Sequence, residues 1–127
     1  MKASRVRALS EEEKEQEMNQ FLWADCILCE NALHILNRRL QVTAHLDTRE
    51  QIESTIRTQT KKRDNRMKYM DILEEIYSLT DLLDNDTISE QERIYFTQRR
   101  QSIRDNLSKD KLYNLIWEYH VKLNEFF

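Results

Sequence analysis

The sequence predicts an all-α protein, an antiparallel bundle of about four helices. Its 127 residues include no Gly and no Pro, where average usage would give roughly nine and six. The hairpins of a β-rich fold rely on Gly for turns with positive φ, whereas a few long helices need only two or three connections, which Asn or Asp can form. The two Trp, five Tyr and four Phe residues argue against a disordered chain, although 34% of the residues are charged.

The first helix follows a short basic tail. Residues 1–9 carry three basic side chains and are predicted to be a mobile tail, and residues 10–127 are expected to form a single α-helical domain. Ser10 and Glu13 have the S-x-x-E spacing of a capping box, in which each side chain bonds the other residue's backbone amide. This signal predicts a helix over about 10–45.

The second helix is expected to start at Asp47, whose side chain would cap it. It should extend over about 48–84. Between Ile56 and Met67 the chain has no Val, Ile, Leu, Met or aromatic residue, which predicts either a solvated length of helix or a kink near 60–66. The sequence alone leaves the continuity of this helix open.

A polar loop separates the second helix from the third. The segment DNDTISEQE contains two overlapping capping boxes, Thr87/Glu90 and Ser89/Glu92. Either box would start a third helix, which we expect over about 88–107.

A break is predicted within the last forty or so residues. At 100° per residue, the apolar residues up to Leu107 and those from Leu112 onward form two faces offset by roughly 160°. One core cannot be served by both faces of a single helix. We therefore expect a break near 106–108, with Ser108 as the N-cap of a fourth helix over about 109–127.

The composition excludes several classes of function. No apolar window approaches 18 residues, and no apolar segment follows the basic tail, so neither a membrane span nor a signal peptide is expected. The absence of a Gly-rich loop excludes the phosphate-binding motifs, and H-E-x-x-H is absent as well. We therefore expect a soluble cytoplasmic protein that is not an enzyme and binds neither a cofactor nor a membrane.

Cys26 and Cys29 form a C-x-x-C pair, and His34 follows five residues later. On a helical wheel His34 lies roughly 140° from Cys29, so the three side chains diverge, whereas zinc requires converging ligands. The pair also lies far from the helix N-terminus that lowers the pKa of redox cysteines. We predict Cys29 in the core, Cys26 at its edge and no metal; a zinc site completed by His45 or His120 is the alternative.

An acidic residue interrupts the apolar side of the first helix. Asp25 lies in the middle of an arc of roughly 200° that contains Met18, Phe21, Leu22, Leu28, Cys29, Ala32, Leu33, Ile35, Leu36 and Leu40. A lone buried carboxylate is costly, so we expect a structural ion pair between Asp25 and Arg99, which lies on the apolar face of the third helix. Glu92 competes for the same Arg, and an open end of the core is the alternative place for both charges.

Two sets of apolar residues are predicted to bind a protein partner. Trp23 and Ile27 lie one turn apart on the polar face of the first helix, and exposed Trp side chains often anchor interfaces. Tyr113, Trp117 and Phe127 belong to the second of two apolar stripes on the fourth helix. Together the two stripes form a wider apolar face than one neighbouring helix normally covers. Either these residues bind a partner, a second copy of the chain included, or other parts of the chain cover them.

A run of basic residues occupies the middle of the second helix, and the segment that contains it has a single acidic residue, Asp64. The basic residues are Arg57, Lys61, Lys62, Arg63, Arg66 and Lys68. Basic helices contact phosphates, but no aromatic residue that could stack on bases occurs before Tyr69. The run predicts a solvated face that steers a partner, and nucleic-acid binding is the alternative.

The segment RRLQVTAH covers residues 38–45. From Arg39 to His45 it resembles the R-x4–6-H motif of HEPN-type ribonuclease domains. Those domains are also small all-α proteins. The resemblance implies that Arg39 would steady the scissile phosphate and that His45 would handle protons. Leu40 stands where that family usually has a polar residue after the Arg.

The sequence therefore favours a small non-catalytic protein-interaction module, such as an inhibitor, adaptor or assembly factor, that presents a helical face to a protein. A nucleic-acid-binding protein is the first alternative and a HEPN-like ribonuclease the second. The small size and the lack of catalytic motifs would suit a protein encoded by a phage or a mobile element.

Overall fold

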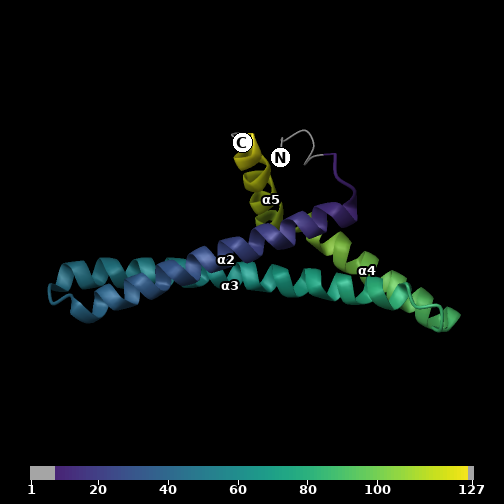
Figure 1. The fold of residues 1–127 in the computed structure, drawn as a ribbon, viewed down its shortest axis with the longest axis horizontal. Helices are drawn as coiled ribbons and strands as arrows, with labels where there is room; N and C mark the ends of the chain where they lie inside the picture. The colour runs from purple at the N-terminus through teal and green to yellow at the C-terminus, as the bar shows by residue number, and fades with distance from the viewer. Residues whose placement is uncertain (1–7, 126–127) are drawn as a thin grey trace. The chain divides into compact units, whose positions relative to one another are not determined.

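A computed structural model describes residues 8–125, which fold into four α-helices joined by short connections. In the labels of Figure 1 the helices are α2 (Glu11–Val42), α3 (Leu46–Leu83), α4 (Glu90–Lys109) and α5 (Lys111–Asn124). The described residues contain no strand, so the predicted all-α class with about four helices is confirmed. The predicted tail falls mainly on residues 1–7, which lie outside the described residues together with 126–127.

Capping boxes start α2 and α4 where the sequence predicts them. At α2 the backbone amide of Glu13 donates to Ser10 Oγ and the amide of Ser10 donates to Glu13 Oε1, both over 3.2 Å. At α4 Ser89 and Glu92 exchange the same two bonds, both over 3.1 Å, whereas Thr87 bonds a neighbouring Asn side chain. Of the two overlapping boxes in this loop, the Ser89/Glu92 box is the one that forms.

The start of α3 differs from the prediction. The helix begins at Leu46, so Asp47 lies in its first turn and is not its cap. Arg49 holds the connection instead, because its Nη1 donates to the carbonyl oxygens of Leu40 and Thr43, over 2.6 and 2.9 Å, at the end of α2. A guanidinium that satisfies unpaired helix carbonyls replaces the glycine that often ends a helix, and no described residue has a positive φ.

A single residue, Asp110, separates α4 from α5. Its backbone is extended (φ −79°, ψ 112°), and its side chain accepts a bond of 3.1 Å from the backbone amide of Tyr113. The predicted break near 106–108 is therefore too early, and the predicted cap at Ser108 is wrong. Ser108 donates to the Asp105 carbonyl oxygen over 2.7 Å within α4. The reason for the break holds, because the two apolar faces do belong to two helices.

α3 is a continuous helix across its polar segment, so there is no interruption near 60–66. Arg63 and Arg66 take positions where a regular repeat would have apolar residues, and both are half-buried. Arg66 Nε donates to Asp25 Oδ2 on α2 over 2.8 Å. Because the polar side chains find partners across the helix pair, the helix continues without apolar residues there.

The described chain divides into two compact units. The hairpin unit comprises Gln20–Met70 and holds the second part of α2 and the first part of α3. The terminal unit combines the residues up to Asn19 with those from Asp71 onward, and holds the start of α2, the end of α3, α4 and α5. The expected single domain over 10–127 stays a prediction beside this division.

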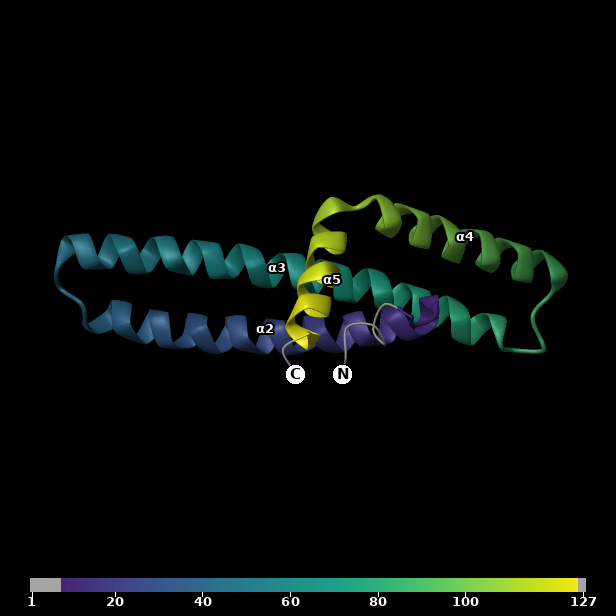
Figure 2. The ribbon, with the colours of Figure 1, turned by 90° about the horizontal axis from the view of Figure 1, so that it is seen from above.

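In the hairpin unit α2 and α3 run antiparallel from the connection at 43–45 (Figure 2). The side of α2 toward α3 repeats every seven residues, with members three and four residues apart, as in a coiled coil. Its members are Leu22, Cys26, Cys29, Leu33, Leu36 and Leu40. The first four are buried, so this repeat is the seam on which α3 packs.

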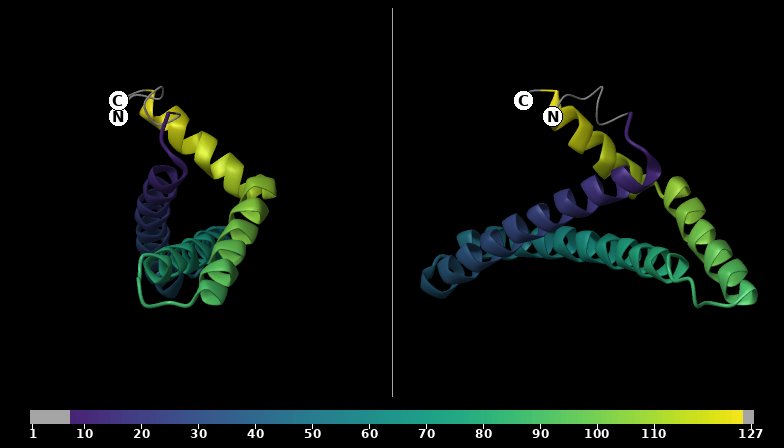
Figure 3. Two further views of the ribbon diagram at one scale, coloured as in Figure 1. Left: turned by 90° about the vertical axis from the view of Figure 1, so that its right-hand side faces the viewer. Right: turned by 45° about the vertical axis from the view of Figure 1, so that its right-hand side comes forward.

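The terminal unit has its own core, to which all four helices contribute. The loop 84–89 reverses the chain between α3 and α4 (Figure 3). Buried apolar side chains fill the space between the helices: Met18, Leu73, Ile76, Leu79, Ile103, Leu107, Ile116 and Val121. Among them lies a buried charge, Glu15, which is only 5% exposed.

Candidate functional site

Trp23 and Ile27 form an apolar spot on the outer side of α2 in the hairpin unit. Their side chains are 59% and 37% exposed. Gln20, Glu30 and His34 on the same side are exposed as well, so polar residues surround the spot. A large aromatic side chain with a polar rim is typical of an interface anchor. Both residues are thus accessible, and their binding to a partner stays a prediction.

The stripe of α5 that we expect to bind a partner is buried at both of its residues that the structure describes. Tyr113 and Trp117, which we expect to face a partner, are buried in the terminal unit. The neighbouring stripe is exposed at Leu112, Leu115 and Tyr119, but its Ile116 is buried as well. Phe127, the third residue predicted on the binding stripe, lies outside the described residues. An angular count shows that α5 has two stripes, but not which one meets the core.

Contacts with α2 explain why α5 turns its aromatic stripe inward. Lys14 Nζ lies 5.1 Å from the centroid of the Trp117 ring, within the range of a cation–π interaction. His120 Nε2 lies 3.5 Å from Glu17 Oε2, and the His120 ring lies 5.5 Å from the Trp117 ring. Burial lowers the pKa of His120 by more than Glu17 raises it. His120 is therefore a packed side chain on this helix.

Asp25 is paired, but not with the predicted partner. Its Oδ2 accepts the bond from Arg66, and its Oδ1 lies 3.6 Å from Lys62 Nζ. Arg66 and Lys62 both lie on α3 of the hairpin unit. Arg99 pairs with Glu75 in the terminal unit, over 2.8 Å to Oε1. A mostly buried carboxylate does need a cation, but the Asp25–Arg99 pair is wrong, because the basic run of α3 supplies that cation.

Cys26 and Cys29 are free, buried thiols in the seam of the hairpin unit. Cys26 Sγ lies 3.8 Å from both the Arg63 carbonyl oxygen and Met70 Sδ. Burial raises the pKa of both thiols, which makes them weak nucleophiles near neutral pH. Across the described residues, no group of three or more His, Cys, Asp or Glu side chains could hold a metal ion, which leaves the zinc alternative without a ligand set.

The basic run of α3 is divided between ion pairs and solvent. Lys62 and Arg66 pair with Asp25, and Arg63 Nη2 lies 3.3 Å from Asp64 Oδ1. The exposed members are Arg57, Lys61 and Lys68. Half of the charges are therefore engaged within the protein, which leaves a smaller cationic surface than the sequence suggests.

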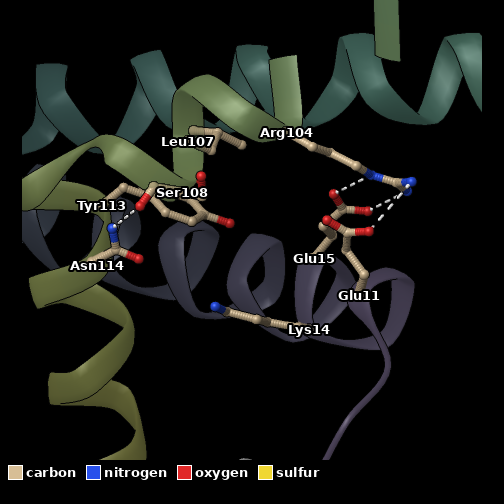
Figure 4. A pocket seen from close by; sticks show the side chains of 8 residues that line it. All are labelled: Glu11, Lys14, Glu15, Arg104, Leu107, Ser108, Tyr113 and Asn114. Atoms are coloured by element: carbon tan, nitrogen blue, oxygen red, sulfur yellow. Dashed lines mark hydrogen bonds and ion pairs between the residues drawn. The ribbon is translucent and has the colours of Figure 1, made fainter. Parts of the chain in front are cut away.

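A small pocket of the terminal unit is lined by several charged side chains, of which Arg104 pairs with both Glu11 and Glu15 (Figure 4). Its volume is about 120 Å³, and it is lined by Glu11, Lys14, Glu15, Arg104, Leu107, Ser108, Tyr113 and Asn114. Arg104 donates twice to Glu15, from Nε to Oε2 over 3.0 Å and from Nη2 to Oε1 over 2.9 Å. Burial alone would lower the pKa of Arg104, but its hydrogen bonds to Glu15 keep that pKa above its usual value. This pair fits a structural role.

Arg39 and His45, the residues that resemble the ribonuclease motif, are exposed near the connection of α2 and α3. The Arg39 carbonyl oxygen accepts a bond of 2.6 Å from the Thr43 hydroxyl at the end of the helix. Their side chains thus lie in the same part of the hairpin unit, and their role in cleavage stays a prediction.

Comparisons with known proteins give no guide to function. No protein-family model, no curated protein and no solved structure matches this chain. None of the helices in the described part is long and apolar enough to cross a membrane.

Sequence reasoning missed a second apolar column on α2. Leu28, Ile35 and Val42 are 66%, 52% and 84% exposed, although the helical wheel places the first two in the core arc. That arc is too broad for one neighbouring helix. The seven-residue spacing of the three residues is the signal that could have shown a helix with two separate apolar repeats.

Proposed function

We propose that this chain is a non-catalytic protein-interaction module that binds a protein partner through Trp23 and Ile27 on α2. The observation that carries the proposal is the exposed Trp side chain. Trp23 is 59% exposed although it lies one turn from the buried Cys26. Covering its exposed part with a partner would contribute roughly 3 kcal/mol, as much as a typical anchor residue of an interface contributes.

Charge and redox state support two further parts of the proposal. Arg57, Lys61 and Lys68 are exposed on α3 of the same unit and would speed the encounter with an acidic protein surface. The two cysteines are free and buried, which suits a reducing compartment such as the cytoplasm. The origin in a phage or mobile element stays a prediction.

Affinity capture with paired variants tests the proposed surface. The full chain, with a terminal tag, is used to capture proteins from its native cells, and the captured proteins are quantified by mass spectrometry. Trp23→Ala should reduce the capture of the main partner at least about tenfold. Tyr95→Ala, which removes an exposed aromatic side chain from α4, is the matched control and should leave capture unchanged. Equal capture by the wild type and Trp23→Ala would contradict the assignment.

Fluorescence provides a direct readout of the same surface. Trp117→Phe leaves Trp23 as the single Trp of the chain, so the emission reports the environment of position 23 alone. Adding the purified main partner should shift this emission to shorter wavelength as the ring leaves water. An unchanged spectrum at saturating partner would show that binding occurs elsewhere.

Nucleic-acid binding is the second candidate, because Arg57, Lys61 and Lys68 lie on the outer side of one helix and face solvent. A labelled single-stranded RNA is titrated at several salt concentrations. If the candidate holds, affinity falls steeply with salt, and the triple Ala variant has a flatter slope. Undetectable binding at low salt would remove this candidate. Cleavage of the same RNA that is lost in His45→Ala would instead favour the ribonuclease reading.

A further inference from the structure

The outer column of α2 is a second heptad repeat beside the one that packs on α3. Leu28, Ile35 and Val42 are each seven residues apart. A straight α-helix drifts by about 20° per seven residues, so the three side chains stay within roughly 40° of one another. The column lies on a different side of the helix from Trp23, which is roughly 100–140° away from its three members.

The column is a large apolar surface for three residues. Given their exposed fractions of 66%, 52% and 84%, the side chains of Leu28, Ile35 and Val42 leave roughly 300 Å² of apolar area in water, comparable to the largest apolar patch of a typical monomer, which is often functional. The flanking Asn31, Arg38 and Arg39 are exposed too. If these flanking residues are covered as well, two such helix faces would bury up to roughly 1,200 Å² in total, the lower limit for a specific protein interface.

The same face is hollowed where a neighbouring side chain could enter. Ile35, Arg38, Arg39 and Val42 line an open hollow of about 350 Å³. In helix pairs that pack in heptad repeats, a side chain of one helix fits between four side chains of the other. The four lining residues are spaced at i, i+3, i+4 and i+7, the spacing of such a hole.

We propose that the occupant of this face is a second copy of the chain, packed antiparallel on α2 around a two-fold axis near Ile35. Leu28 and Val42 are equally far from Ile35 along the sequence, so each would lie opposite the other residue in the second copy. Arg38 and Arg39 would lie opposite Ala32 and Asn31, which are uncharged. Parallel packing would instead set the arginines against their own copies, and like charges repel.

The oligomeric state of matched variants tests the proposal. Light scattering and sedimentation equilibrium are measured on the full chain from about 1 to about 500 µM, because an interface of this size gives modest affinity. The wild type should dimerise reversibly, and Ile35→Glu should raise the dimer Kd at least about tenfold by placing two carboxylates at the axis. Ile94→Glu is the control, because Ile94 on α4 is 50% exposed and Ile35 is 52% exposed. A monomeric wild type, or equal effects of both variants, would overturn the proposal.

Cysteine cross-linking tests the antiparallel register. Around an axis at residue 35 the two copies of Leu28 lie about 21 Å apart at 1.5 Å per residue, too far for a disulfide. Leu28→Cys alone should therefore not cross-link, whereas a mixture of Leu28→Cys and Val42→Cys should form a dimer with one of each. The native thiols are buried. Cross-linking of Leu28→Cys with itself would show parallel packing and refute this geometry.

Discussion

Breaking the buried pair of Glu15 and Arg104 is expected to lower the unfolding free energy more than any other change proposed below. Glu15 is 5% exposed, and both of its carboxylate oxygens accept bonds from Arg104, over 2.9 and 3.0 Å. Arg104→Met would keep much of the side-chain volume but leave the carboxylate buried without its cation. Breaking a buried pair from one side costs about 3–5 kcal/mol, a large share of the roughly 5–15 kcal/mol by which a domain is stable.

The double variant separates the cost of an unpaired charge from the value of the pair. Glu15→Met combined with Arg104→Met removes both charges, so neither is left buried alone, and the loss should be within about 1 kcal/mol of the parent. Urea unfolding followed by circular dichroism at 222 nm gives the unfolding free energies for the double-mutant cycle.

The control for this cycle is an exposed pair in the same unit. Arg99 and Glu75 are bonded over 2.8 Å but lie at the surface, so Arg99→Met should leave the urea midpoint nearly unchanged. If Arg104→Met destabilises the protein no more than Arg99→Met, the buried carboxylate of Glu15 does not need its cation. The same conclusion follows if the losses of unfolding free energy in Glu15→Met and in Arg104→Met simply add up in the double variant.

Three smaller contacts make measurable predictions as well. Asp110→Ala removes the N-cap of α5 and should cost about 1 kcal/mol of unfolding free energy in urea, whereas Ser108→Ala should cost much less, and equal losses would contradict the capping assignment. Burial holds the pKa of His120 below its ordinary 6.5, so the folded state binds fewer protons than the unfolded state. The unfolding free energy should therefore fall as the pH drops below about 6.5. His120→Phe should remove that part of the fall, and the same pH profile in wild type and variant would disprove this. Burial raises the pKa of the thiols of Cys26 and Cys29, so a thiol reagent should label them slowly in buffer and rapidly in urea, and rapid labelling in buffer would show that they are exposed.

Local signals in the sequence predicted the helices well, because each signal acts within a few residues. The reciprocal bonds of Ser10 and Glu13, and those of Ser89 and Glu92, form as their spacing indicates. The predicted cap of the last helix was wrong, because Asp110, two residues after Ser108, caps α5 instead. Such choices are decided by packing, which no local pattern contains.

The candidate sites were harder to predict, because they depend on which helix covers which face. Asp25 needed a cation, but the choice of Arg66 rather than Arg99 follows from the pairing of α2 with α3. Similarly, the buried Tyr113 and Trp117 could not be told from the exposed stripe of α5 before the helix had a neighbour. Exposed apolar residues are recognisable only after every internal contact has been assigned.

The hairpin unit has a further consequence for how this chain could change in length. It is one continuous segment, Gln20–Met70, between two parts of the terminal unit, and its two helix segments meet at the connection held by Arg49. Because its seam repeats every seven residues, removing or adding seven residues in each arm would keep the register of all remaining pairs. The length of the hairpin unit could therefore change in whole heptads, by natural selection or by design, while the core of the terminal unit keeps its sequence.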